Sequence, residues 1–473
     1  MIPSNEQLEG ECGMMGRLDD RQPSLFYNFC LESHLPTDHL LRKIAGVLDL
    51  SDVRNKLSPY YSAMGRPSLD PELMIRMLLV GYLYGIRSER RLVEEVHLNL
   101  AYRWFCGLGL TGEVPDRSSF SKTRHGRFRD SDAFRLVFEN VLQACLRAGL
   151  VGGETFATDA SVIEADARVA RSAQSKSPPD DWNDPANITR PVREYLDQLD
   201  KAAGFELLAG ERQQPPKSLS LTDPGAALTS KGKSKIAFAY GTNYLVDTKA
   251  AIIVDVEASP ARGTAEVAAT RAMIVRVKER FGLHPRRLAA DTAYGSGGNL
   301  AWLVDRKIEP HIPIFDRSSQ TGGVFTRNDF TYDQDADAYI CPGNKTLQRI
   351  CVRDNGVTII YRARNRDCSV CALKFKCTKS AVRSLSVNAH EDVRQYAAAL
   401  AKTEEFKKSA FARRKVEMLF AHLKRNLNFR RLRLRGMTGA RDECTLAAAA
   451  QNLRKLVRLI GFSPPETAGI CVA

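Results

Sequence analysis

Three acidic residues in separate parts of the chain have local contexts suited to holding a metal ion together. They are Asp159 in Ala-Thr-Asp-Ala-Ser, Asp291 in Ala-Asp-Thr-Ala-Tyr-Gly, and Glu417 in Arg-Arg-Lys-Val-Glu-Met-Leu. Carboxylates that bind a divalent metal beside a cationic surface can support chemistry on the phosphodiesters of nucleic acid. Each residue alone is weak evidence among 55 acidic residues, because an Asp after a strand usually forms a turn or caps a helix.

Positive charge is concentrated around Glu417. The 473-residue chain has a formal net charge of +14, and residues 402–435 contain twelve Lys or Arg against three Glu, a local net of +9. Such a run is commonly a solvated helix face. Within 429–436, however, arginines alternate with leucines, so one edge would be buried while the other presents guanidinium groups. We therefore favour contact with phosphates, made by Arg430, Arg431, Arg433 and Arg435.

The helix predicted around Glu417 places three charged residues in one row. At about 100° per residue, Arg413, Glu417 and Lys424 point in similar directions. The apolar stripe is centred roughly 90° away and consists of Ala412, Val416, Leu419, Leu423 and Leu427. The row should therefore lie between core and solvent, where a carboxylate can reach a metal and the cations can reach phosphates. An intrahelical row of ion pairs is the alternative.

Composition indicates a cytoplasmic protein, which we expect to be associated with the nucleoid. Hydrophobic residues make up 44% of the chain and charged residues 26%. The longest apolar run, 73–84, is interrupted by Arg76 and is too short to span a bilayer. No secretory signal is visible, and eleven cysteines without one argue against a disulfide framework.

Residues 25–150 have helical patterns throughout. Asp70 followed by Pro71 predicts the start of one helix, and apolar residues over 92–104 predict a second. A short helix is expected after Asp116, presenting cations outward: Arg117, Lys122, Arg124 and Arg127. Short helices ending in a basic one are typical of helix-turn-helix DNA readers; a packing or dimerisation domain is the alternative.

From residue 153 the pattern changes to alternating strands and helices. The elements predicted in order are a strand over 154–163, a loop over 172–191, a short helix over 192–199, strands over 237–240, 244–246 and 251–256, a helix over 263–281, a strand over 287–291, a helix near 299–303 and a strand over 310–314. This order predicts an α/β domain with antiparallel strands at one side. Asp159 and Asp291 are expected near strand ends, where sites form in open α/β sheets.

Together, the three acidic contexts resemble those of the DDE transposases of bacterial insertion sequences, a branch of the RNase H-like nucleotidyltransferases. In that family the first Asp follows Thr and precedes a small residue and Ser or Thr, as Thr158-Asp159-Ala-Ser does. The second precedes Ala or Gly and an aromatic residue, as Asp291-Thr-Ala-Tyr does.

The third acidic residue of the family belongs to a Tyr, Arg, Glu, Lys pattern. Arg413, Glu417 and Lys424 match its register, whereas the Tyr position holds Ala410. Residues 65–84 are similar to the family's helical N-terminal domain, and the likeness extends over about residues 15–460.

The resemblance implies an α/β architecture, an RNase H-like mixed-sheet catalytic core with an all-helical N-terminal DNA-binding domain and a cysteine-containing insertion. The expected parts are the helical domain at 15–150, the first part of the core at 151–325 with an insertion at 167–235, the cysteine-containing insertion at 326–400, and the C-terminal catalytic helices at 401–462.

The resemblance also implies a two-metal mechanism. Asp159, Asp291 and Glu417 would hold two Mg²⁺ ions, or Mn²⁺ in their place, for DNA cleavage and strand transfer at the ends of an insertion sequence. Arg413 and Lys424 would position phosphates. The partners implied are double-stranded DNA and a second copy in a homodimer. Two alternatives are a catalytically silent, transposase-derived DNA-binding protein and an RNase H-like nuclease that does not join strands.

Cysteines in the predicted insertion are spaced as in a tetrahedral zinc site. Cys368 and Cys371 form a Cys-x₂-Cys pair, with Cys341 before it and Cys377 after it. Four thiolates would make a structural Zn²⁺ site without an open position. Cys351 could replace Cys341, and reduced cysteines without a metal are the alternative.

Overall fold

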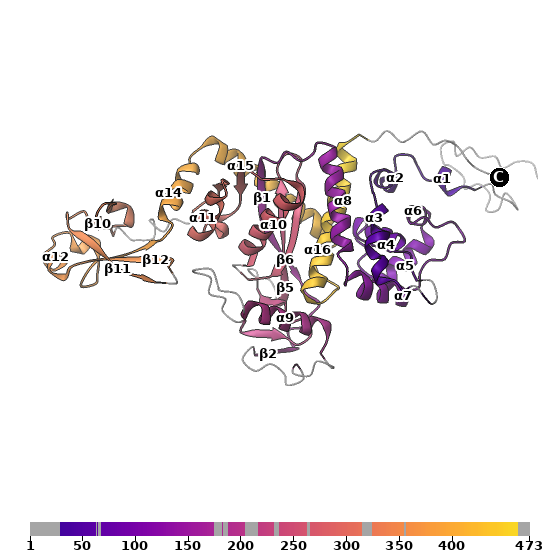
Figure 1. Cartoon of the computed structure of the whole chain (residues 1–473), viewed down its shortest axis with the longest axis horizontal. Coiled ribbons are helices and arrows are strands. Elements are labelled where there is room, and N and C mark those ends of the chain that lie inside the picture. Colours follow the sequence, from indigo (N-terminus) through magenta and orange to yellow (C-terminus); the bar gives the residue numbers. More distant parts are fainter. Residues whose placement is uncertain are drawn as a thin grey trace, which may run out of the picture.

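The computed structural model describes residues 29–461 apart from 63, 65–67, 175–181, 183–187, 204–215, 231–235, 263–264, 315–323 and 354–355. Helices of the N-terminal region lie at one end, a mixed sheet with its helices occupies the middle, and a small antiparallel sheet lies at the other end (Figure 1). The expectations for residues 15–28 and 462, and for residues 65–67 of the stretch similar to the family's helical domain, fall outside the described residues.

The N-terminal region is helical, as predicted. Its helices are α1 (Leu31–His34), α2 (Leu40–Ala45), α3 (Ser51–Leu57), α4 (Pro71–Leu83), α5 (Glu89–Leu98), α6 (Leu100–Phe105), α7 (Arg117–Thr123) and α8 (Ala133–Arg147), with a 3₁₀ turn η1 (Ser58–Tyr60). Asp70 caps α4 by accepting hydrogen bonds from the amides of Glu72 and Leu73. The single helix predicted over 92–104 is wrong, because the Asn99 side chain accepts from two amides and starts α6.

The central sheet has six strands in mixed orientation, in the order β4-β5-β1-β7-β8 with β6 also paired to β5. The strands are β1 (Thr155–Glu164), β4 (Ala227–Thr229), β5 (Ala237–Asp247), β6 (Ile252–Pro260), β7 (Arg287–Ala289) and β8 (Glu309–His311). β1 runs antiparallel to β5 and parallel to β7, and β7 runs parallel to β8. The α/β class and the antiparallel strands at one side are thereby confirmed.

β5 is one long strand where the sequence predicted two. The predicted break fell on Gly241, Thr242 and Asn243, polar or small residues that suggest a turn. They are buried, and Asn243 Nδ2 donates to the carbonyl of Glu257 at 2.9 Å. A Cβ on Gly241 would meet Ser259 Oγ at 2.9 Å. The strand continues because β6 accepts hydrogen bonds from the Asn243 amide and the Thr242 hydroxyl lies 3.1 Å from Cys444 Sγ of α16 (Gly436–Leu459).

Each face of the sheet is covered by different helices. Thr158 of β1 contacts Thr270 of α10 (Ala265–Phe281), with 2.8 Å between the hydroxyl oxygens. On the opposite face, Tyr244 stacks on Phe420 of α15 (Glu404–Arg425) and donates to Gln451 of α16 (Gly436–Leu459) at 2.9 Å. Since neighbouring residues of a strand point to opposite faces, Asp159, which pairs with Tyr244, faces α15.

The predicted insertion at 167–235 contains more regular structure than a loop. It forms a small sheet of β2 (Ser172–Gln174) and β3 (Ser218–Ser220), the amphipathic helix α9 (Arg190–Ala203), and β4, which extends the central sheet on β5. The helix expected around 192–199 is confirmed. The loop expected over 172–191 is wrong at its start, where β2 pairs with β3.

Residues 331–388 form a separate five-stranded antiparallel sheet with its own apolar core. Its order is β13-β12-β11-β10-β9, with β9 (Thr331–Asp333), β10 (Ala338–Ile340), β11 (Thr346–Arg353), β12 (Thr358–Ala363) and β13 (Ser384–Asn388). The short helices α12 (Asn365–Ser369) and α13 (Lys374–Cys377) connect its last two strands. The helix α14 (Glu391–Leu400) then leads back to α15 and lies against α11 (Gly297–Asp305).

A buried carboxylate joins the N-terminal helices to the C-terminal ones. Glu443 of α16 is fully buried and pairs with Arg87, which precedes α5. The other oxygen of Glu443 accepts from the amides of Arg433 and Leu434, each at 2.6 Å. The Arg87 guanidinium also lies over the rings of Tyr82 and Phe429. Every oxygen of this carboxylate is thus used, as a buried charge requires.

We predict that Glu443→Ala lowers the free energy of unfolding by about 3–5 kcal/mol, because it leaves the Arg87 charge and two amides buried without an acceptor. Urea unfolding followed by circular dichroism measures this. Glu94→Ala removes a carboxylate from the exposed pair with Arg90 and should cost less than about 1 kcal/mol. Equal effects of the two substitutions would contradict this role of Glu443.

Candidate active site

Asp159 and Asp291 leave the sheet at the same edge. The parallel pairing of β1 with β7 ends at Ala157 and Ala289, and each Asp follows two residues later. The prediction that Asp159 lies near the end of its own strand is wrong, because antiparallel pairing with β5 continues as far as Glu164. The neighbouring strand β7 ends beside Asp159, so it does not cover the Asp159 carboxylate on that side.

Asp291 caps the 3₁₀ turn η4 (Thr292–Tyr294). Its Oδ1 accepts from the amide of Ala293 at 2.9 Å. This is the ordinary role of an Asp after a strand. The cap engages one carboxylate oxygen, so the second oxygen is not committed to it.

Glu417 lies on α15, the helix that packs on the face of the sheet to which Asp159 points. Arg413 connects the elements: its Nη1 is 3.5 Å from Asp159 Oδ2 and its Nη2 is 3.1 Å from Glu417 Oε1. Val416 and Leu423 are fully buried, while the Glu417 side chain is 54% exposed. The predicted position of this row between core and solvent is confirmed.

Asp291 and Glu417 are both close enough to Asp159 to perturb its carboxyl group. Burial raises the pKa of the Asp159 carboxyl, and the charges of Asp291 and Glu417 raise it further. The amide of Ala160 and the Arg413 guanidinium oppose this rise in pKa without cancelling it. Separate like-charged groups that act on one half-buried carboxylate are characteristic of functional sites.

Tyr294 is a residue of this site to which the sequence assigned no role beyond its motif. Its side chain is buried, and within the described structure its hydroxyl has no hydrogen-bond partner of good geometry. Burial raises the pKa of Tyr294, and the carboxylates of Glu266, Asp159 and Asp291 add to the increase. The Thr270 side chain of α10 opposes this increase in pKa, so the phenol of Tyr294 lies beside a polar group of that helix.

Carboxylate oxygens are the ligands that Mg²⁺ prefers, so the donor set of Asp159, Asp291 and Glu417 fits this ion. Among the described residues, however, no three His, Cys, Asp or Glu side chains converge as in a metal site. At the acidic site, Arg413 contacts two of the acids. Its guanidinium supplies the positive charge that a metal would otherwise supply.

The four cysteines predicted to form a zinc site lie in one neighbourhood. The pKa of Cys377 is raised mainly by burial, and the thiols of Cys341, Cys368 and Cys371 also contribute to it. A Cβ on Gly343 would lie 3.6 Å from the sulfur atoms of both Cys341 and Cys371. Among the described residues these four cysteines, like the three acids, are not close enough together to form a metal site.

Arginines and leucines alternate after α15 as predicted. Leu432 and Leu434 are buried, while the arginines beside them are exposed: Arg430, Arg431, Arg433 and Arg435. Arg433 lines a cavity of about 370 Å³ together with Arg117, Arg87 and Arg90. Cations from two distant parts of the sequence therefore share one surface. Lys122 is exposed on α7, the helix that also carries Arg117.

The prediction that Arg124 points outward is wrong. This residue is 4% exposed, and its Nη1 lies 2.8 Å from Glu89 Oε1. After α7 the chain forms a π-helical turn, η2 (Arg124–Phe128). The wider turn changes the direction of side chains from that of a regular 3.6-residue helix, so Arg124 is directed into the protein and is not available to DNA.

Two family models match the chain, and both describe transposase domains. The first, "Transposase domain (DUF772)", matches residues 29–126, and the second, "Transposase DDE domain", matches residues 340–457. The two matches support a DDE transposase of the insertion-sequence type. In this transposase the second match includes Glu417, whereas Asp159 and Asp291 lie outside both matches, so their assignment depends on the geometry of the sheet.

No curated protein matches the transposase. Among solved structures, a cryo-EM structure of the piggyBac transposase synaptic complex with hairpin DNA aligns with 90% of this chain and 77% of that chain, at 9% identity and a TM-score of 0.31. A likeness of this size does not establish a shared fold. In the part of the transposase that is described, no helix has the length and apolar character needed to cross a membrane.

We predict that Asp159→Asn stabilises the metal-free transposase at neutral pH. Because the pKa of Asp159 is raised on folding, its contribution to stability is present at low pH and is lost as the pH rises through that pKa. The neutral amide avoids this loss. The variant should therefore unfold at a higher temperature than the wild type in EDTA at pH 7.5, and the difference should shrink towards pH 4.

Glu257 provides a control of opposite sign. Burial alone would raise its pKa, but the ion pairs with Arg441 and Arg276 bring the pKa below its usual value. Glu257→Gln should therefore lower the unfolding temperature at pH 7.5, with a difference that also shrinks as the pH falls. A destabilised Asp159→Asn protein at pH 7.5 would contradict the electrostatic description of the site.

Proposed function

We propose that this transposase cleaves DNA at the ends of its insertion sequence and joins the cut ends to target DNA in a metal-dependent reaction. The observation that carries the proposal is that Arg413 bridges Asp159 and Glu417, while the charges of Asp291 and Glu417 both raise the pKa of Asp159. Within the six-stranded sheet, β6, β5 and β1 run antiparallel in turn, and β7 and β8 run parallel to β1, which supports an RNase H-like core. Catalysis would then take place at the edge of the sheet where the pairing of β1 with β7 ends.

In the proposed mechanism Asp159, Asp291 and Glu417 hold two Mg²⁺ ions, or Mn²⁺. Bound there, the metals would supply activation of a water or 3′-hydroxyl nucleophile and stabilisation of the leaving oxygen. Arg413, freed from the two carboxylates, can bind a phosphate oxygen of the DNA. Lys424, on the same side of α15, would hold a neighbouring phosphate.

Double-stranded DNA is the proposed partner, and pairing two element ends requires a second copy of the chain. The helical domain at 15–150 would bind DNA through Arg117 and Lys122, and the basic segment through Arg430, Arg431, Arg433 and Arg435. The cavity shared by Arg117 and Arg433 supports one continuous DNA surface across both parts. Such binding would keep the protein on the nucleoid in the cytoplasm.

The proposed role of the small sheet is to hold a structural Zn²⁺ between Cys341, Cys368, Cys371 and Cys377. The electrostatic grouping of these four thiols, which does not include Cys351, favours Cys341 as the fourth ligand. Thiolates at tetrahedral positions suit Zn²⁺. The short helices α12 and α13 contain no buried residue, so the ion would stiffen a connection with few apolar contacts of its own.

We predict that Asp159→Asn, Asp291→Asn and Glu417→Gln each reduce Mg²⁺-dependent cleavage of DNA carrying the element's ends by about 10²–10³-fold or more. Affinity for the same DNA should stay within a few-fold of wild type. Asp130→Asn, at an exposed ion pair with Arg190, is the control and should keep full cleavage. Full cleavage by all three acidic variants would overturn the metal-site proposal.

The same assay separates the alternatives. Cut but unjoined ends with the wild-type protein would indicate a nuclease, and binding without any cleavage in Mg²⁺ or Mn²⁺ would indicate a silent DNA-binding protein. Joined products that require the three acids support the proposal.

We predict that protein purified without chelator contains about one zinc per chain, measured by elemental mass spectrometry. Cys371→Ser should lose most of the metal, whereas Cys351→Ser should keep it. Because a structural zinc contributes to folding, the Cys371→Ser variant should also become sensitive to proteolysis within 331–388. Equal zinc content in both variants would contradict the assigned ligand set.

A further inference from the structure

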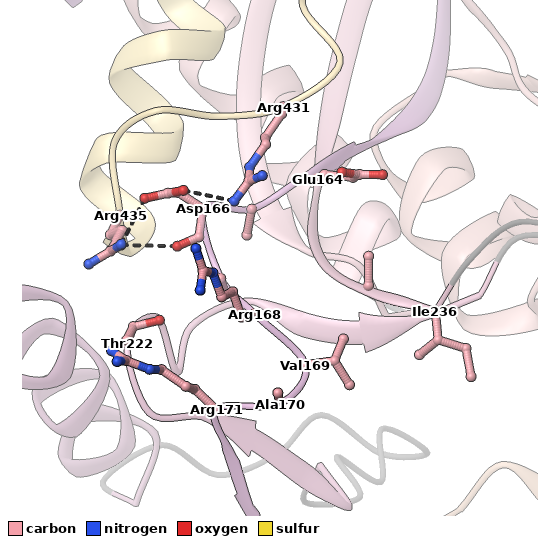
Figure 2. Close-up of a pocket in the computed structure, with 13 residues that line it drawn as sticks. Glu164, Asp166, Arg168, Val169, Ala170, Arg171, Thr222, Ile236, Arg431 and Arg435 are labelled. Carbon is pink, nitrogen blue, oxygen red and sulfur yellow. Dashed lines mark hydrogen bonds and ion pairs between the residues drawn. The ribbon is translucent and has the colours of Figure 1, made fainter.

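A second cationic cavity lies at the far end of β1. It has a volume of about 630 Å³, within the range of ligand sites. Residues 164–171 form one wall, and Thr222, Ile236, Ala237, Arg431 and Arg435 complete it (Figure 2). None of the three acids of the candidate active site lines it, so it is a separate site.

Backbone hydrogen bonds join the basic segment beside this cavity to β1, the strand that carries Asp159. The amide of Glu164, the last residue of β1, donates to the carbonyl of Arg430 at 3.1 Å, and the amide of Leu432 donates to the carbonyl of Glu164 at 2.8 Å. The basic segment is thus hydrogen-bonded to the strand end. Glu164 lies five positions along the strand from Asp159, a distance of about 16 Å.

A single carboxylate pairs with two of the arginines in this cavity. Asp166 accepts from Arg431 at 2.8 Å and pairs with Arg435 at 2.9 Å (Figure 2). The backbone carbonyl of Asp166 also accepts from Arg435 Nε at 2.9 Å. The position of Arg435 therefore does not depend on the carboxylate charge alone.

The wall formed by residues 164–171 contributes two more cations. Arg168 and Arg171 are exposed, and within the described residues neither guanidinium pairs with an acid. Four arginines against Glu164 and Asp166 leave the cavity with a formal charge of +2 (4 − 2). Cations that outnumber the acids around an open cavity form a receptor for an anion.

We propose that this cavity is a second binding site for a DNA backbone phosphate and that Asp166 occupies it in the free protein as an internal competitor. The proposal rests on the DNA-binding function proposed above. Along a duplex with one phosphate per 3.4 Å on each strand, about 16 Å corresponds to roughly five base pairs from the reacting phosphate. DNA bound at the active site can therefore reach the cavity.

Displacement of Asp166 by phosphate is physically reasonable because its ion pairs are partly exposed. The Asp166 side chain is 32% exposed and the two arginines 46% each, and pairs of this kind contribute little. A backbone phosphodiester presents two charged oxygens, as a carboxylate does, and can likewise bind arginine through two parallel hydrogen bonds. Asp166 thus lowers affinity for stray anions while the arginines stay positioned for DNA.

The test measures binding of a mixed-sequence duplex DNA to the full chain as a function of NaCl concentration. Asp166→Asn, which removes the competing charge but keeps its shape, should bind DNA about 3- to 10-fold tighter than wild type. The double variant Arg168→Gln, Arg171→Gln should bind more weakly. The slope of its log affinity against log salt should be less steep by about 0.9 for each phosphate that the variant no longer neutralises.

Lys278→Gln, which removes one exposed charge from α10, is the matched control and should leave the slope unchanged. Unchanged affinity of Asp166→Asn together with an unchanged slope for the double variant would overturn the cavity as a phosphate site. The DNA-cleavage proposal would survive that result if wild type still cleaved DNA. Failure of the wild type to bind duplex DNA would overturn both.

Discussion

The parallel pairing between β1 and β7 ends after three residue pairs, and the candidate site depends on that ending. β1 continues on its antiparallel partner β5, so Asp159 is held in a rigid strand, while the vacated side next to it opens towards Asp291. A longer β7 would cover Asp159 with backbone. The difference in length between two neighbouring strands therefore converts a strand residue into an accessible carboxylate beside a second one.

The third carboxylate reaches this edge because α15 packs on the face to which Asp159 points. Stacking of Phe420 on Tyr244, the strand partner of Asp159, fixes the rotation of the helix. Glu417 then lies on the shoulder of α15 and is connected through Arg413. Hydrophobic packing on one side of the helix thus sets the position of a charged group on the other, which is how a half-exposed carboxylate can be held in place.

Throughout the basic segment, single acids hold groups of cations in defined positions. Glu443 fixes the backbone of Arg433 and the side chain of Arg87, and Asp166 contacts Arg431 and Arg435. These acids differ in burial, and so in consequence. The buried Glu443 joins parts of the protein, whereas the half-exposed Asp166 can be exchanged for another anion.

The sequence by itself determined the helical N-terminal region, the alternation of buried leucines and exposed arginines, and the shoulder position of Glu417, because each follows from local spacing of side chains. The tertiary structure alone decided the rest. It showed that Asp159 lies inside a strand whose neighbour ends, that β5 is continuous through polar residues with partners on β6 and α16, and that Arg124 is buried at the start of a π-helical turn. Strand length, burial of polar groups and turn geometry depend on partners far away in the chain, and no local pattern encodes them.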